Sequence, residues 1–270
     1  MTKPSPSCLT AIIRDPRVWF WLVVAAFILS LELLVRYKWV SPASFAPPSD
    51  IPGGLHELLV TEDYVTDILV TLGRTLLAFG IGYPLGLLGA LVLAGLGTAR
   101  RSGEFVLDVT RSIPITAMIP AFIAVFGIGE STKIASGALS AFFVSLVAIY
   151  SGIRSAAKDS ETLLMLYKPT LRKKIMLVLL PRTVPAAVGA MRLAVSAALV
   201  LVVVTEMFVG ASSGIGKEIY DQAWMASPAK QYAAILTAGA VGYGLNVLFA
   251  RIRTAVSSAW GDGDTDDGRI

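Results

Sequence analysis

The interval from Ser151 to Arg182 combines two kinds of side chain that a partner protein recognises. It is rich in lysine and arginine and holds only two acidic residues. Inside it lies a short apolar block, Leu163-Leu164-Met165-Leu166-Tyr167. Apolar side chains on a polar segment are stabilised when a groove on another protein covers them. The alternative is a helix on the lipid surface with its basic residues near anionic headgroups, and these residues alone leave both readings open.

A few charged residues interrupt the apolar runs of the chain. They are Arg74, Asp108, Arg111, Arg192 and Glu206. Charged groups at membrane depth usually face a water-filled cavity or pair with one another. Arg192 and Glu206 are about 21 Å apart along a helix, so they do not pair, and we expect each near its own interface. We expect Arg74 to reach the interface by extending its aliphatic stem.

The composition is that of an integral membrane protein. Of 270 residues, 55% are hydrophobic and 16% charged, and the mean hydropathy is +0.70. Soluble domains carry about 25% charged residues. One cysteine (Cys8) and one histidine (His56) exclude an internal disulfide and a Cys/His metal site, so no metal is expected. No GxxxxGK[ST] loop is present, so any nucleotide that drives transport must bind another chain.

The apolar runs predict an all-α protein with six transmembrane helices. They cover residues 18–35, 68–96, 105–126, 134–150, 184–209 and 232–249. We predict three parts: 1–67 (tail, first span and outer connector), 68–260 (five spans with a cytoplasmic loop at 152–182) and 261–270 (disordered tail). Most lysines and arginines outside the spans fall on the side of both termini and of the basic loop. That side is therefore cytoplasmic, and nucleic acid is not an expected partner.

Glycine and proline mark two spans. Gly82 and Gly86 form a GxxxG pair, which lets helix backbones approach closely in lipid. Pro114 and Pro120 interrupt the third span, and a broken helix at membrane depth usually faces protein or a water-filled path. The alternative is a kinked structural helix with its charges at the cytoplasmic interface. The candidate path residues are Arg111, Ser112, Pro114, Thr116, Met118, Ser140 and Glu206.

Three segments resemble one family of membrane proteins. They are Arg111-Ser112-Ile113-Pro114 through Phe126-Gly127-Ile128-Gly129-Glu130, Leu179-Leu180-Pro181 through Thr205-Glu206-Met207, and Gly214-Ile215-Gly216. From Thr71 to Trp260 the chain resembles the inner-membrane permeases of binding-protein-dependent ABC importers, within the nitrate, sulfonate and taurine group. The basic loop lies where that family has its ATPase-coupling loop. Its residues differ, because Lys168 stands where the family has a glycine, so pairing with an identical or a different permease stays open.

The resemblance implies a type I importer permease fold in a bacterial inner membrane. Such a chain is a non-catalytic subunit without a cofactor, since ATP and Mg bind the partner ATPase. The implied partners are a cytoplasmic ATPase dimer, a periplasmic or lipid-anchored solute-binding protein and a second permease copy or paralogue. The implied solute is a small anion, although relatives also carry pyrimidine and vitamin precursors. The coupling residues would be Glu161, Leu163, Leu164, Met165, Leu166, Tyr167, Lys168 and Arg172.

A different class of protein stays open from the residues alone. An ion-gradient-driven secondary transporter would use buried carboxylates as a proton relay, with Glu32, Asp108 and Glu206 as candidates. Many such transporters are built from inverted repeats, and the predicted spans show no inverted pair. Dependence of uptake on ATP and on a binding protein separates the two classes.

Overall fold

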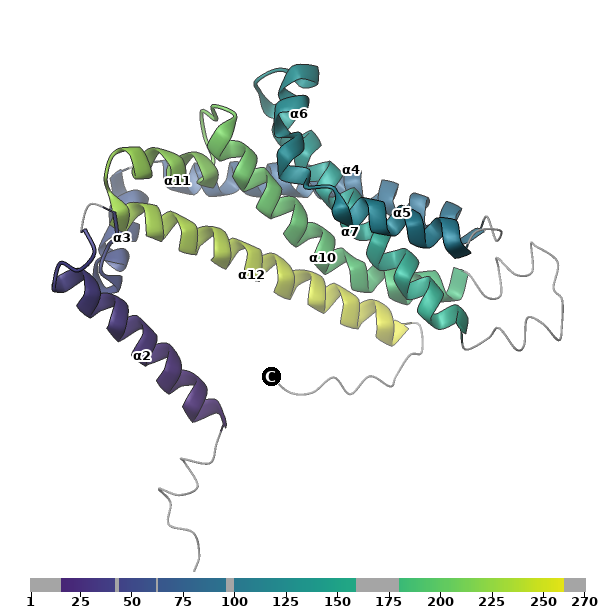
Figure 1. Ribbon diagram of the computed structural model, residues 1–270, viewed down its shortest axis with the longest axis horizontal. Helices are drawn as coiled ribbons and strands as arrows, with labels where there is room; N and C mark the ends of the chain where they lie inside the picture. The colour runs from purple at the N-terminus through teal and green to yellow at the C-terminus, as the bar shows by residue number, and fades with distance from the viewer. Residues whose placement is uncertain (1–15, 42–43, 62, 96–99, 159–179, 260–270) are drawn as a thin grey trace, which may run out of the picture. The chain divides into compact units, whose positions relative to one another are not determined.

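The computed structural model describes residues 16–41, 44–61, 63–95, 100–158 and 180–259, and every regular element in these ranges is helical (Figure 1). The chain divides into two compact units. The first contains Met1–Asp63 with Ile219–Ile235, and the second contains Tyr64–Glu218 with Leu236–Ile270.

The first unit combines the N-terminal helices with a segment from the C-terminal part of the chain, Ile219–Ile235. It contains α2 (Pro16–Arg36), the 3₁₀ helix η1 (Pro48–Asp50) and α3 (Ile51–Thr61), with the end of α11 (Ile215–Trp224) and the start of α12 (Pro228–Ala259). Gly54 lies against the α12 backbone, because a Cβ there would be 2.6 Å from the carbonyl carbon of Ala229. α3 ends at Thr61, and Asp67 belongs to the next helix.

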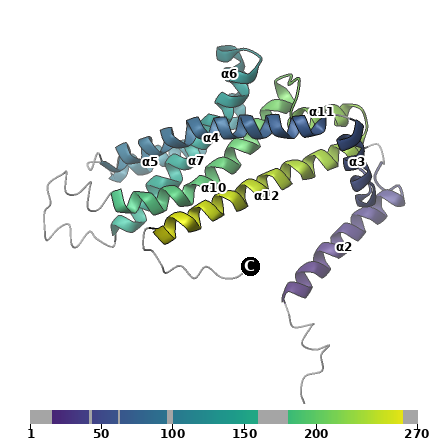
Figure 2. The same cartoon turned by 180° about the vertical axis from the view of Figure 1, so that it is seen from behind.

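Three long helices form the core of the second unit. They are α4 (Tyr64–Gly95), α7 (Glu130–Lys158) and α10 (Leu180–Phe208), and both views show them side by side (Figures 1 and 2). The later part of α12 packs on α10 through Leu245 and Phe249. Many of the buried residues between the helices are alanines, including Ala78, Ala141, Ala190, Ala194 and Ala198. Small side chains at these positions let the backbones approach closely.

The glycine pair of α4 lies directly on α7, which confirms the predicted close approach. A Cβ added at Gly82 would be 2.0 Å from the carbonyl oxygen of Ala138, and one at Gly86 would be 1.8 Å from Oγ of Ser145. The small residues of α7 also make polar contacts with α10. Ser140 Oγ donates a 3.1 Å hydrogen bond to the carbonyl oxygen of Ala197.

Five helices in the described ranges are long and apolar enough to cross a membrane. They are Val18–Arg36, Tyr64–Gly95, Glu130–Ser155, Thr183–Phe208 and Pro228–Val256, matching five of the six predicted spans. The predicted third span, 105–126, is instead three short pieces: α5 (Arg100–Ser112), η2 (Ile115–Met118) and α6 (Ile119–Phe126). None has the roughly 20 apolar residues that a single crossing needs.

The break in this third region lies where the prolines predict it. Pro114 is extended, with φ −74° and ψ 97°, and it separates α5 from η2. Proline has no N–H and excludes the residue before it from helical geometry, so α5 ends at Ser112. Pro120 lies in the first turn of α6, where a missing N–H costs nothing.

Candidate functional site

A buried network of charged side chains joins the three core helices of the second unit. We call it the Arg74 cluster: Thr71 and Arg74 on α4, Glu130 and Lys133 on α7, and Glu206 on α10. It lies at the end where α4 and α7 begin and α10 finishes. Arg74 is 4% exposed and Glu206 is 1% exposed.

One guanidinium makes most of the cluster's links. Nη1 of Arg74 donates to Oε1 of Glu206 at 2.6 Å, and Nη2 donates to Oε1 of Glu130 at 2.6 Å. Lys133 Nζ also reaches Oε1 of Glu130, at 3.0 Å. Two cations thus balance two carboxylates, and this balance matters because an unpaired buried charge is strongly destabilising. Glu130 is the exposed member of the set.

The Glu206 carboxylate has partners on two sides besides Arg74. Thr71 Oγ1 lies 2.9 Å from its Oε2, and the backbone N–H of Gly216 donates to the same oxygen at 3.0 Å. All of these donors point at a charge inside the protein, where hydrogen bonds to ions are strongest. The carboxylate is therefore held in place rather than exposed to a solute.

The loop Ser213–Gly216 is fastened onto the same cluster. Asp67 Oδ1 accepts from the N–H of Gly214 at 2.6 Å, Thr71 Oγ1 accepts from that of Ile215 at 2.9 Å, and Arg74 Nη1 donates to the carbonyl oxygen of Ser213 at 2.7 Å. Gly214 has φ +127°, and a Cβ on it would be 2.5 Å from Cδ of Glu206. The loop thus lies directly on the carboxylate, and only glycine fits there.

The structure corrects the expectation for Arg74. Its side chain does not extend to the interface, because Glu130 and Glu206 hold it inside the helix bundle. Arg192 and Glu206 are not paired with each other, as their separation along α10 predicted. The partner that sequence reasoning missed is Arg74, which is 132 residues from Glu206. The sequence did show a positive charge in one apolar run and a negative charge in another. It did not show that Arg74 and Glu206 form an ion pair in the fold.

A second candidate site is an open groove of about 330 Å³ between α5 and α7. We call it the Arg111 groove, and its lining residues are Leu107, Asp108, Arg111, Tyr150, Ser151 and Arg154. The guanidinium carbon of Arg154 lies 6.0 Å from the centre of the Tyr150 ring. The charged lining residues are two arginines and one aspartate, so the lining has a formal net positive charge, which favours anions.

The other candidate path residues separate into two groups. Ser112, Pro114 and Thr116 are exposed in the single chain, and Met118 is half-buried. These four continue from Arg111 along the break between α5 and α6. Ser140 and Glu206 lie instead in contacts between the core helices.

The candidate coupling residues cannot be placed in the same way. Glu161 to Lys168 and Arg172 lie outside the described residues. Of the flanking helices, α7 is described up to Lys158 and α10 from Leu180. The role assigned to these residues stays a prediction.

Comparison with known proteins identifies the family. Residues 82–261 match the binding-protein-dependent transport system inner membrane component family. The chain belongs to this family. The permease is 28% identical over 225 residues to an aliphatic sulfonates transport permease of Bacillus subtilis (strain 168), covering 82% of this chain and 80% of the relative. It is 29% identical over 198 residues to a nitrate import permease of Synechococcus elongatus, covering 70% and 69%.

A solved structure has the same fold. The permease aligns with a chain of the MetNI methionine ABC transporter, determined in inward-facing conformations, with a TM-score of 0.57 and 20% identity. The alignment covers 71% of this permease and 95% of that chain. This likeness concerns the helical fold alone.

Family membership confirms several predictions made from the sequence. The permease is an inner-membrane, non-catalytic subunit of an ABC importer, and its family binds no cofactor itself. A component of a binding-protein-dependent transport system works with an ATPase and a solute-binding protein.

Proposed function

We propose that this permease and a second permease chain, a copy or a paralogue, form the path for a small anionic solute. A cytoplasmic ATPase dimer would drive transport, and a periplasmic or lipid-anchored protein would deliver the solute. The observation that carries the proposal is the positively charged Arg111 groove beside the broken third region. It fits the relatives named for sulfonate and nitrate, both of which are anions; taurine, a sulfonate, belongs to the same class.

The broken third region would supply the sixth crossing of the membrane. α5, η2 and α6 together would cross once, which places both termini on the cytoplasmic side. An irregular backbone at membrane depth is tolerated where it lines a cavity, because water then satisfies the freed carbonyl groups. Exposed Ser112, Pro114 and Thr116 suit such a wall, with Arg111 at one end of it and Met118 further along.

The loop 152–182 would transmit the movement of the ATPase. Its apolar block, Leu163 to Tyr167, would insert into an ATPase groove, and its basic residues would orient the contact. The loop follows α7 and precedes α10 in the chain. The Arg74 cluster ties these two helices to α4, so a displacement that starts in the loop would move the three together.

The surroundings of Glu206, one of the three candidate relay residues, do not favour the ion-gradient alternative. A proton relay at Glu206 would need a carboxylate that gains and loses a proton during transport. This carboxylate is buried and accepts from Arg74, Thr71 and the N–H of Gly216, contacts that favour a structural role for Glu206. Family membership also favours ATP-driven import.

Vesicles that contain the permease and its ATPase test the proposal. Uptake of radiolabelled sulfonates and nitrate is measured with and without internal ATP, external binding protein and an uncoupler. We expect uptake to need both ATP and the binding protein and to persist with the uncoupler. Uptake that continues without ATP and stops with the uncoupler would contradict the proposal. Transport of a neutral or cationic solute alone would refute the anion assignment but not the ATP-driven mechanism.

A further inference from the structure

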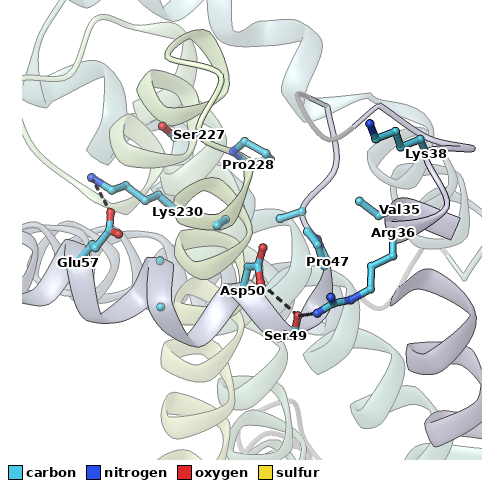
Figure 3. A pocket seen from close by; sticks show the side chains of 14 residues that line it. Val35, Arg36, Lys38, Pro47, Ser49, Asp50, Glu57, Ser227, Pro228 and Lys230 are labelled. Carbon is cyan, nitrogen blue, oxygen red and sulfur yellow. Dashed lines mark hydrogen bonds and ion pairs between the residues drawn. The ribbon is translucent and has the colours of Figure 1, made fainter. Parts of the chain in front are cut away.

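The first unit contains an open pocket of about 710 Å³ that the transport function does not use. Its walls come from the end of α2, the segment leading into η1, the start of α3 and the first turn of α12 (Figure 3). We call it the connector pocket. Its charged residues are Arg36, Lys38, Asp50, Glu57 and Lys230.

The connector pocket presents both signs of charge. Glu57 and Lys230 form an ion pair at 3.6 Å on one side, and Arg36 Nη2 donates to Ser49 Oγ at 3.3 Å on the other (Figure 3). Arg36 Nε also donates to Oε1 of Glu32 at 2.5 Å, so this guanidinium is already ion-paired. Ser49 Oγ in turn lies 3.2 Å from Oδ1 of Asp50. Among the residues that the structure describes, none forms a hydrogen bond or ion pair with the Lys38 ammonium, so a ligand can use it.

Lys38 occupies a backbone position that favours glycine. Its φ is +58°, its N–H donates to the carbonyl oxygen of Val35 at 3.0 Å, and the N–H of Trp39 donates to that of Leu34 at 3.0 Å. This pair of bonds is the Schellman ending of a helix, in which the left-handed residue is usually glycine. A lysine in this left-handed conformation strains the backbone, and such strain is common where a side chain has a function.

The pocket borders the ends of two helices that are long and apolar enough to cross a membrane. The span in α2 ends at Arg36 and the span in α12 begins at Pro228, and both residues line the pocket. Tyr37 and Trp39, on either side of Lys38, are 72% and 81% exposed. Aromatic side chains with a polar edge concentrate at the lipid headgroups. A ligand in this pocket is therefore most readily supplied by the lipid.

We propose that the connector pocket binds the headgroup of an aminophospholipid such as phosphatidylethanolamine. The phosphate lies toward the Lys38 ammonium, and the headgroup ammonium lies toward the Asp50 carboxylate. Arg36 and Glu57 already have partners in Glu32 and Lys230. A purely anionic headgroup would satisfy the cations but meet the carboxylates as like charges.

Native mass spectrometry of the purified whole transporter tests this assignment. The transporter is mixed with equal amounts of phosphatidylethanolamine and phosphatidylglycerol, and the lipid retained is measured. We expect phosphatidylethanolamine to be retained in excess. The variant Lys38→Gly removes the ammonium and suits the left-handed backbone, so we expect retention of both lipids to fall about two- to fivefold without loss of thermal stability.

One further variant tests the ammonium end of the headgroup, and a second variant is a control for a lost surface cation. Asp50→Asn should abolish the preference for phosphatidylethanolamine while leaving phosphatidylglycerol bound. Arg253→Gln, at an exposed position near the other end of α12, is the matched control and should change nothing.

Three results would overturn the proposal. One is equal retention of the two lipids by the unmodified transporter, unaffected by Lys38→Gly. Another is displacement of the lipid by inorganic phosphate alone, which would make the pocket a site for free anions. The third is that Lys38→Gly leaves lipid retention unchanged but weakens capture of the solute-binding protein, which would make the pocket a protein-docking surface.

Discussion

Arg74 is held by acceptors on α7, on α10 and on the loop before α11. A guanidinium has five N–H donors in a fixed plane, and here they reach Glu130, Glu206 and the carbonyl oxygen of Ser213. A buried pair of this kind contributes little net stability compared with apolar residues of the same size. Loss of one partner costs much more, because the other charge stays buried.

Replacing Arg74 alone should therefore destabilise the permease. We expect Arg74→Met to lower the free energy of unfolding by about 3–5 kcal/mol, because Glu206 then keeps only hydroxyl and backbone donors. The measurement is denaturant-induced unfolding in detergent. The double variant Arg74→Met with Glu206→Leu should recover much of the loss, and Arg253→Met should have little effect. Equal losses in the single and double variants would show that the charge pairing is not the cause.

Arg111 is expected to act on the solute and not on the fold. Its side chain is exposed in the Arg111 groove, so Arg111→Gln should leave unfolding unchanged. A hydrogen bond from a cation to an anion contributes about 1.5 kcal/mol or more, so uptake at low solute concentration should fall about tenfold. Arg253→Gln serves as the control for a lost surface cation. Unchanged uptake in Arg111→Gln would remove this residue from the path.

At the scale of helices, the contact between α4 and α7 depends on two glycines that have no side chain to hold the backbones apart. Gly82 and Gly86 are one turn apart and both face the α7 backbone. Membrane helices gain little from apolar burial against each other, so close backbone packing has to supply the attraction. The small residues of α7 at Ala138, Ala141 and Ser145 complete the contact from the other side.

Replacing a glycine of α4 by alanine should change stability differently at packed and unpacked positions. Gly86→Ala would place Cβ 2.6 Å from the carbonyl oxygen of Phe142, so we expect a loss of about 1–3 kcal/mol in unfolding measurements. A Cβ added at Gly80 would have no atom within 4 Å, so Gly80→Ala should be neutral or stabilising by up to about 1 kcal/mol. If both variants behaved alike, the close approach of α4 to α7 would be wrong.

Local patterns predicted the helices better than the contacts between them. Apolar runs located five spans, and Pro114 located the break in the third region, because both signals act within one turn of the chain. The GxxxG pair predicted close packing but did not identify α7 as the partner. The Arg74 cluster joins residues 56 and 132 positions apart, and no local rule relates them.

At the scale of the whole molecule, the Arg74 cluster lies at one end of α7 and α10, and the loop proposed to contact the ATPase follows from their other ends in the chain. α7 runs from the cluster toward the loop, and α10 runs back from it. The ends near the cluster are fixed to α4 by ion pairs, while the other ends continue into the loop. This arrangement suits a subunit in which another protein moves the loop and α4, α7 and α10 follow together.

The most direct test of this account is ATP-driven uptake by a permease with an altered apolar block in the coupling loop. Leu164→Asp with Leu166→Asp should abolish uptake and loosen the ATPase during purification, while membrane insertion stays normal. Leu164→Met with Leu166→Met keeps the apolar volume and should retain uptake. Normal ATP-driven uptake by the aspartate variant, with the ATPase still bound, would contradict the account.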